Sequence, residues 1–149
     1  MKNAFCPHPP DYLMEGKDFL EVANRLFKSA HEADRRTSVS RSYYAVFNHV
    51  KTVLESFGIT LSSDASAHQK ICQYLRNSGL DEAEGAAQNL SSLRTTRNDA
   101  DYDMKASVFD NKNCLLWYKK AELCIDSFNG VDKKELRKGI IEYKRIIND

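Results

Sequence analysis

Residues 39–57 read VSRSYYAVFNHVKTVLESF and contain the most regular apolar pattern in the chain. Large apolar side chains recur here at steps of three and four residues, the spacing that places them on one face of an α-helix. The stripe is formed by Val39, Tyr43, Val46, Val50, Val53, Leu54 and Phe57, and Tyr44 and Phe47 widen it. Gly58 follows, where a glycine commonly ends a helix. The segment predicts an amphipathic helix with one buried face.

The same periodicity extends in both directions from this segment. Further helices are predicted for residues 12–33, 67–76, 81–102, 111–128 and 132–148. We expect residues 34–38 to be a polar linker that caps the central helix, and Asp110 to cap the helix over 111–128. These segments predict an all-α domain of about five to six helices.

The N-terminal residues are predicted to lack a helix. Pro7, Pro9 and Pro10 cannot occupy a helix interior, because proline lacks the backbone N–H and clashes with the preceding turn. Residues 1–11 are therefore expected to be an extended lead-in. Gly16 is expected to weaken the first turns of the helix over 12–33.

Length and composition fit one globular domain over residues 1–149. A chain of this size buries about two thirds of its surface in a single core. Its 42% hydrophobic and 29% charged residues exclude disordered and membrane-embedded classes. No apolar run approaches the roughly 18 residues of a membrane-spanning helix, and the N-terminus lacks the apolar segment of a secretory signal. We expect a cytoplasmic protein without a membrane partner.

The cysteine spacing predicts free thiols. The four cysteines are Cys6, Cys72, Cys114 and Cys124, with no C-x-x-C pair and no histidine at zinc-finger spacing. The last three fall in helical segments, where cysteine commonly packs as a small hydrophobe. We expect no metal site and no cofactor.

The last two predicted helices differ in character. The packing candidates of the helix over 111–128 are Leu115, Leu116, Tyr118, Leu123 and Ile125. The C-terminal helix, within residues 131–149, has Leu136, Ile140, Tyr143 and Ile147 on one side and lysines and arginines on the other. We interpret this basic face as solvated, with surface binding to nucleic acid as the alternative. Because the net charge is only +1, RNA binding requires a local cluster of cations.

Arg97 interrupts the apolar face of the helix over 81–102. That face is formed by Ala83, Ala86, Leu90 and Leu93. An unpaired guanidinium there would cost several kcal/mol to desolvate, so a partner is expected, and Asp101 lies one turn later. Arg94 and Asn98 are close by. The alternatives are an Arg97–Asp101 pair that only fixes helix register and a functional site.

The central helix contributes a second group of candidates. Tyr43 and Tyr44 differ by about 100° around the helix, so they cannot both face one groove fully, and Tyr43 is expected in the core. Arg41 can reach the region of Arg97 if the two helices pack together, which would make a small basic site for phosphate. A solvated arginine is the alternative.

Two separated segments also form a recognisable pair of motifs. Residues 40–48 read SRSYYAVFN and residues 93–103 read LRTTRNDADYD. This pair is similar to the HEPN family, in whose small stand-alone prokaryotic members a helix with S-R-x-Y-Y-A-x-F precedes one ending in R-x-x-A-D-Y. The resemblance implies an up-and-down helical bundle and a homodimer that brings the arginine-bearing helix ends together. It also implies a toxin–antitoxin or defence setting, with RNA and a minimal nucleotidyltransferase antitoxin as candidate partners.

The chain departs from this family at one position that matters for catalysis. Many HEPN proteins are metal-independent ribonucleases with the motif R-x(4–6)-H, but residues 102–104, five to seven positions after Arg97, read YDM. Histidine suits proton transfer because it titrates near neutral pH, whereas tyrosine, with a pKa of about 10, is a poor base. We expect His49 and His68 to be structural or exposed rather than catalytic.

Three functions fit these residues. The first is a HEPN-like module that binds RNA or nucleotides in a toxin–antitoxin or defence system without cleaving RNA. The second is an atypical metal-independent ribonuclease whose catalytic residues are Arg97, Tyr102 and Asp101. The third is a structural dimerisation domain. The expected binding residues are Arg41, Arg94 and Asn98.

Overall fold

The computed structural model describes residues 13–149, and all regular structure in this part of the chain is helical. The helices are α1 (Asp18–Leu26), α2 (Glu32–Ser56), α3 (Ser66–Arg76), α4 (Asp81–Tyr102), α5 (Asn111–Asn129) and α6 (Lys133–Ile147). The all-α prediction is confirmed. The predicted lead-in over residues 1–11, with Cys6, lies outside the described residues. Across residues 13–149, none of the helices combines the length and apolar character that crossing a membrane requires.

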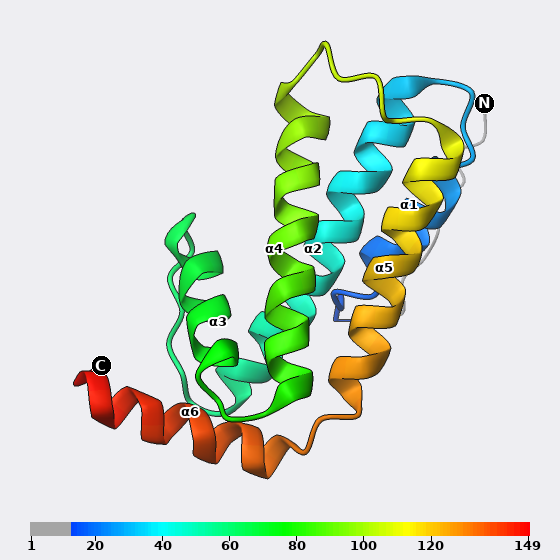
Figure 1. Cartoon of the computed structure of the whole chain (residues 1–149). Helices are drawn as coiled ribbons and strands as arrows, with labels where there is room; N and C mark the ends of the chain where they lie inside the picture. Colours follow the sequence, from blue (N-terminus) through cyan, green and yellow to red (C-terminus); the bar gives the residue numbers. More distant parts are fainter. Residues whose placement is uncertain (1–12) are drawn as a thin grey trace.

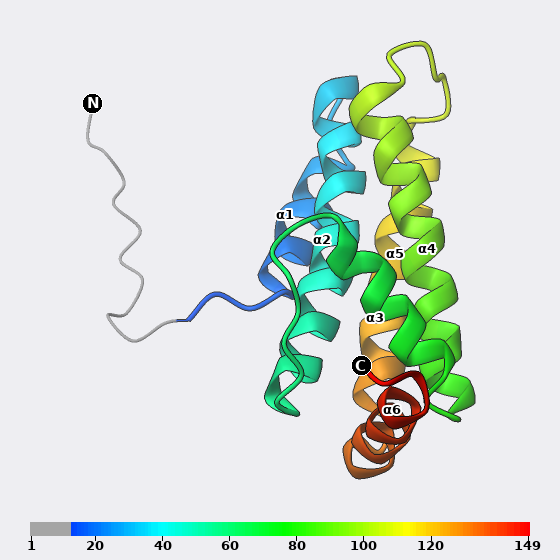
Figure 2. The same cartoon turned by 90° about the vertical axis from the view of Figure 1, so that its left-hand side faces the viewer.

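Helices α1, α2, α4 and α5 run side by side along the long axis of the molecule, and α3 lies against α4 (Figures 1 and 2). Helix α6 runs across one end of this bundle and meets α3 there (Figure 1). The arrangement is therefore an up-and-down bundle with one crosswise helix at its end.

Helix α2 occupies the centre because it packs against α1, α4 and α5. Most of its predicted stripe is buried, namely Val39, Tyr43, Val46, Val50 and Leu54. Val53 and Phe57 are partly buried against the same core. The apolar face predicted for this helix is confirmed, and α2 is the element that positions side chains for the site described below.

The start of α2 differs from the prediction. Residues 34–38, expected as a linker, form the first turns of α2, which begins at Glu32. Polar side chains stabilise these turns from within the fold. The hydroxyl of Ser38 donates a hydrogen bond of 2.8 Å to the carbonyl oxygen of Ala23, and Arg36 is buried. The linker prediction was wrong because it interpreted polar residues as solvated.

Helix α1 is shorter than the helix predicted over residues 12–33. Gly16 precedes it, at a point where a Cβ atom would come within 2.7 Å of the Ala45 oxygen and the His49 nitrogen in the α2 backbone. The chain therefore passes directly against α2 before α1 begins, an approach that only glycine permits.

The guanidinium of Arg36 holds the end of α4. It is 8% exposed and donates hydrogen bonds to the backbone oxygens of Ala100 (3.0 Å), Asp103 (2.8 Å) and Ala106 (2.9 Å). Its Nε donates to Glu32 at 2.8 Å. The last carbonyls of a helix have no partner within the helix, so a cation there is favourable. Arg36 thereby fixes the turn that follows α4.

Helix α5 begins as predicted, since the Asp110 carboxylate accepts a hydrogen bond of 2.8 Å from the backbone N–H of Asn113. Its buried face differs. Leu116 and Leu123 are 58% and 64% exposed, so their assignment as packing residues was wrong. The buried residues of α5 are Cys114, Ala121, Cys124, Ile125 and Phe128. The small side chains among them face inward because α5 packs against both α2 and α4. As predicted, the free, buried thiols include Cys72, Cys114 and Cys124.

Helix α6 lies within the predicted C-terminal helix and packs through Leu136 and Ile140, which are fully buried. Ile147 is 37% exposed, so it does not belong to the buried stripe. A Cβ atom at Gly139 would overlap the carbonyl oxygen of Ser78, in the turn between α3 and α4. This backbone contact seats α6 across the end of the bundle.

Candidate functional site

A cavity of about 360 Å³ lies between α2, the segment that leads into α3 and the second half of α4. We call it the tyrosine–arginine cavity. Its cationic lining residues are Lys51, Arg94 and Arg97, and its aromatic ones are Tyr43, Tyr44, Phe47 and Tyr102. Ser62, Ser63, Asp64, Ala65 and His68 complete the lining. Three lining cations face a single lining carboxylate, so the cavity favours an anion.

Arg97 is held in place by three partners. Its guanidinium donates hydrogen bonds of 2.8 Å to the Tyr44 hydroxyl and to Oδ1 of Asn98. Its Nε lies 3.0 Å from Oδ2 of Asp101, although the N–H does not point at that oxygen, so this contact is an ion pair rather than a hydrogen bond. The Arg97 side chain is 18% exposed. The partner expected for Arg97 is thus present, and the cavity still reaches the guanidinium.

Arg94 is less engaged than Arg97. It lines the cavity one turn earlier on α4 and takes part in none of the ion pairs found among the described residues. Lys51, on the opposite wall, has only a distant partner, since its Nζ lies 3.8 Å from the Glu55 carboxylate. Arg94 and Lys51 therefore leave positive charge for a bound anion.

Tyr102 stands at the mouth of the cavity. Its side chain is 72% exposed, and the guanidinium carbon of Arg97 lies 5.7 Å from its ring centre. An exposed aromatic ring beside a cation offers a stacking surface for a planar ligand group.

His68 belongs to the inner wall of the cavity. It is 7% exposed, its Nδ1 lies 3.2 Å from the Tyr43 hydroxyl, and its Nε2 lies 3.6 Å from Sγ of Cys72. Burial, assisted by the positive charges of Arg94 and Arg76, lowers the pKa of His68 to about 4. Its ring is therefore neutral near pH 7, and both nitrogens have protein partners. This geometry fits a structural histidine.

Burial also shapes the two groups beside His68. It raises the pKa of Tyr43 to about 12, against the opposing charges of Arg94 and Arg97. It likewise raises the pKa of the Cys72 thiol. Both groups stay protonated near neutral pH, so Tyr43 supplies no phenolate base and Cys72 no thiolate.

The loop before α3 forms the remaining wall. The Asp64 carboxylate accepts hydrogen bonds from the Ser66 hydroxyl (2.5 Å), the Ser66 N–H (2.8 Å) and the Ser62 hydroxyl (2.9 Å), and these bonds hold its pKa below the usual range. This carboxylate is therefore committed to the first turn of α3. The positive end of the α3 dipole lies at the same wall.

Arg41 lies beside the cavity rather than in its lining. Its guanidinium carbon is 4.9 Å from the ring centre of Phe19 and 5.1 Å from that of Tyr44. The Nε of Arg41 is buried without a hydrogen-bond partner among the described residues. The structure thus places Arg41 near the Arg97 region, with Tyr44 as the contact between them.

The structure brings all six candidate residues to one region, but only some of them line the cavity. Those that line the cavity are Arg94, Arg97 and Tyr102, while Asp101 and Asn98 pair with Arg97 and Arg41 contacts Tyr44. The other lining residues were not among these candidates, and they include Tyr44, Lys51 and His68. Of these three, only Tyr44 could have been suspected from the sequence, because it lies on the flank of the apolar stripe of α2.

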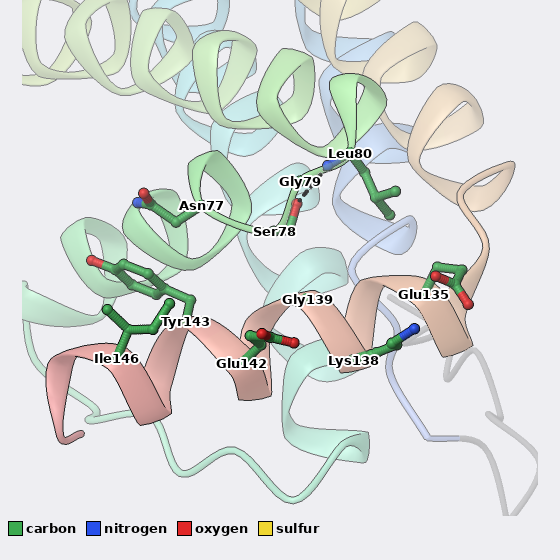
Figure 3. Close-up of a pocket in the computed structure, with 10 residues that line it drawn as sticks. All are labelled: Asn77, Ser78, Gly79, Leu80, Glu135, Lys138, Gly139, Glu142, Tyr143 and Ile146. Atoms are coloured by element: carbon green, nitrogen blue, oxygen red, sulfur yellow. Dashed lines mark hydrogen bonds between the residues drawn. The ribbon is translucent and has the colours of Figure 1, made fainter.

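A second, larger groove of about 450 Å³ lies between α6 and the turn that joins α3 to α4. Figure 3 shows Glu135 and Lys138 at one end of it and Tyr143 and Ile146 at the other. With Glu142 it carries two carboxylates against one cation. This groove does not suit an anionic ligand, so the tyrosine–arginine cavity is the better candidate site.

Comparison of the chain with protein-family models, with curated proteins and with solved structures gives no match. The function is therefore inferred from the geometry of the cavity and from the two motifs that line it.

Proposed function

We propose that this chain is a HEPN-like module that binds RNA or nucleotides through the tyrosine–arginine cavity, as a component of a toxin–antitoxin or defence system. Arg94 is the observation that carries this proposal. It presents a guanidinium without an ion-pair partner among the described residues to a cavity that also contains Arg97 and Lys51. Guanidinium groups bind phosphate oxygens through paired hydrogen bonds.

The aromatic lining supports the same class of ligand. Proteins that bind single-stranded nucleic acid combine cations that contact the backbone with aromatic rings that stack on bases. Here the exposed ring of Tyr102 adjoins Arg97, and the Tyr44 hydroxyl oxygen accepts a hydrogen bond from the same guanidinium. A phosphate near Arg94 and a base on Tyr102 would use both features of the site.

Binding of a fluorescein-labelled single-stranded RNA, followed by anisotropy at increasing salt, tests the proposal. Arg94→Gln should weaken binding about tenfold, the loss expected for one charge-assisted hydrogen bond. Arg137→Gln is the matched control, because Arg137 is exposed on α6. If the Arg94 variant is folded and binds as well as the wild type, the cavity is not the RNA site.

The second candidate is a metal-independent ribonuclease with Arg97 and Tyr102 as catalytic residues and Asp101 as the partner that positions Arg97. The proximity of the exposed Tyr102 ring to Arg97 favours it. In this reaction the 2′-hydroxyl would attack phosphorus and lose its proton to water, Arg97 would stabilise the charge that develops at phosphorus, and Tyr102 would donate a proton to the departing 5′-oxygen. Cleavage of a mixed RNA pool in EDTA that is lost in both Arg97→Ala and Tyr102→Phe would support catalysis. An inactive wild type would leave the binding module.

The proposal includes a homodimer and a minimal nucleotidyltransferase partner, as the resemblance implies, and the cytoplasmic location expected from the composition. Leu116 and Leu123, exposed along α5, are compatible with an interface between subunits. Sedimentation equilibrium of the wild type and of Leu116→Lys tests the dimer. A structural dimerisation domain, the third candidate, predicts that Arg94→Gln changes neither RNA binding nor assembly.

A further inference from the structure

Guanidinium groups and aromatic rings alternate from α1 across α2 to α4. The guanidinium carbon of Arg41 lies against Phe19 and Tyr44, and that of Arg97 lies 5.2 Å from the Tyr44 ring centre. Tyr102 then adjoins Arg97. Arg41 and Arg97 are therefore neighbours through one ring, and their separation cannot exceed the two ring distances taken together.

The charge of Arg41 is the unexplained part of this row. Arg97 has Asp101 and Arg36 has Glu32, but none of the ion pairs found among residues 13–149 includes Arg41. Its Nε is buried without a hydrogen-bond partner among these residues. A partly desolvated guanidinium is strongly stabilised by an anion that approaches it.

We propose that the RNA site extends past the cavity over Tyr44 to Arg41, so that Arg41 binds a second phosphate. The natural ligand is then single-stranded RNA of at least two nucleotides rather than a mononucleotide. This inference rests on the proposed function and adds the substrate class. The cavity holds one phosphate near Arg94, and the chain of the ligand crosses Tyr44 to reach the second cation.

The single-stranded form follows from the aromatic residues. Rings interleaved with cations along a groove let successive bases stack while the backbone contacts the cations, and this requires unpaired bases. The exposed face of Tyr102 is open to such a base. A duplex, whose bases are already stacked, cannot place a base on the Tyr102 ring.

The wild-type protein provides the first test, by isothermal titration with 5′-phosphorylated uridine, its dinucleotide and its tetranucleotide. The dinucleotide should bind about tenfold more tightly than the mononucleotide, the gain expected for one further charge-assisted contact. The slope of log affinity against log salt should become steeper by about 0.7, the value for one more phosphate neutralised on a single strand.

Variants at Arg41 locate the second phosphate. Arg41→Gln should remove both the dinucleotide gain and the added salt slope, so that this variant binds the mononucleotide and the dinucleotide with equal affinity. Arg41→Lys keeps the charge and should retain the slope. Arg137→Gln should change nothing. Circular dichroism melting verifies that each variant is folded, because Arg41 packs against two rings.

The outcomes separate this inference from the proposed function. If the wild type binds neither mononucleotide nor tetranucleotide, the proposed function itself is wrong. Equal affinity of the wild type for both, or a folded Arg41→Gln variant that keeps the dinucleotide gain, overturns the extension alone. Should Arg41→Gln fail to fold, the wild-type length series and Arg41→Lys decide the question. A tetrathymidylate control measures any preference of the site for RNA.

Discussion

Replacing Arg36 with methionine should loosen the end of α4 that carries Asp101 and Tyr102. Methionine keeps an apolar stem of similar length but removes the hydrogen bonds to backbone oxygens in the last turn of α4 and just after it. It also removes the contact of the guanidinium with the ring of Phe109, at 4.7 Å. Because this cation is buried, its loss should lower the free energy of unfolding and also disturb the site.

The expected loss in the free energy of unfolding is about 3 kcal/mol. Removing one member of a buried ion pair typically costs about 3 to 5 kcal/mol, largely because the other charge is left without a partner. Glu32, the partner here, is 52% exposed and can turn to water. The carbonyl oxygens of the α4 terminus can also gain water. Both effects place Arg36→Met at the lower end of that range.

Urea unfolding followed by circular dichroism measures this change. With a slope of about 2 kcal/mol/M, the midpoint should fall by about 1.5 M at unchanged slope. Arg137→Met is the control and should stay within about 0.5 kcal/mol of the wild type, because the side chain of Arg137 is exposed. A loss below about 1 kcal/mol for Arg36→Met would refute the role of Arg36 as the residue that holds α4.

Three other changes test separate parts of the structure. Asp101→Asn should raise the affinity for a short RNA about threefold, because it removes a carboxylate that competes with phosphate for Arg97; unchanged or weaker binding in titration would argue against this competition. His68 has a pKa near 6.5 in the unfolded chain but about 4 in the folded protein, so stability should fall as the pH drops from about 7 to 5. In His68→Gln the urea midpoint should depend less on pH over this range. An equally steep pH dependence in the variant would place the effect elsewhere. Gly139→Ala should lower the melting temperature, because the added Cβ atom would overlap Ser78. Gly85→Ala has open space around the added Cβ atom and should raise stability by about 0.5 to 1 kcal/mol. Similar shifts in both variants would contradict the close packing of α6 on the turn that contains Ser78.

The sequence predicted most of the helices well, because apolar periodicity and the residues that end a helix are local signals. The helices over 67–76, 81–102 and 111–128 match α3, α4 and α5 within a residue or so, each bounded by polar or glycine residues. The first helix and the linker at 34–38 failed. There the deciding contacts are the hydrogen bonds of Ser38 and Arg36 to segments 15 and more than 60 residues away.

For α5, too, the sequence predicted the helix correctly but not which of its faces is buried. Periodicity identified a helix but assigned Leu116 and Leu123 to the core, whereas the structure buries Cys114, Ala121 and Cys124 instead. Which stripe of a helix is buried depends on the helices beside it and on how closely they approach. Side-chain size alone does not decide it.

By itself, the sequence determined that the chain is all-helical, that Arg97 needs a partner and that Asp101 can supply it, because these relations lie within one or two helical turns. Only the tertiary structure decided that Tyr44 binds Arg97, that His68 lines the wall and that Arg94 has no ion-pair partner among the described residues. These facts depend on contacts between α2, α3 and α4, whose residues are far apart in the chain and meet only when the helices pack.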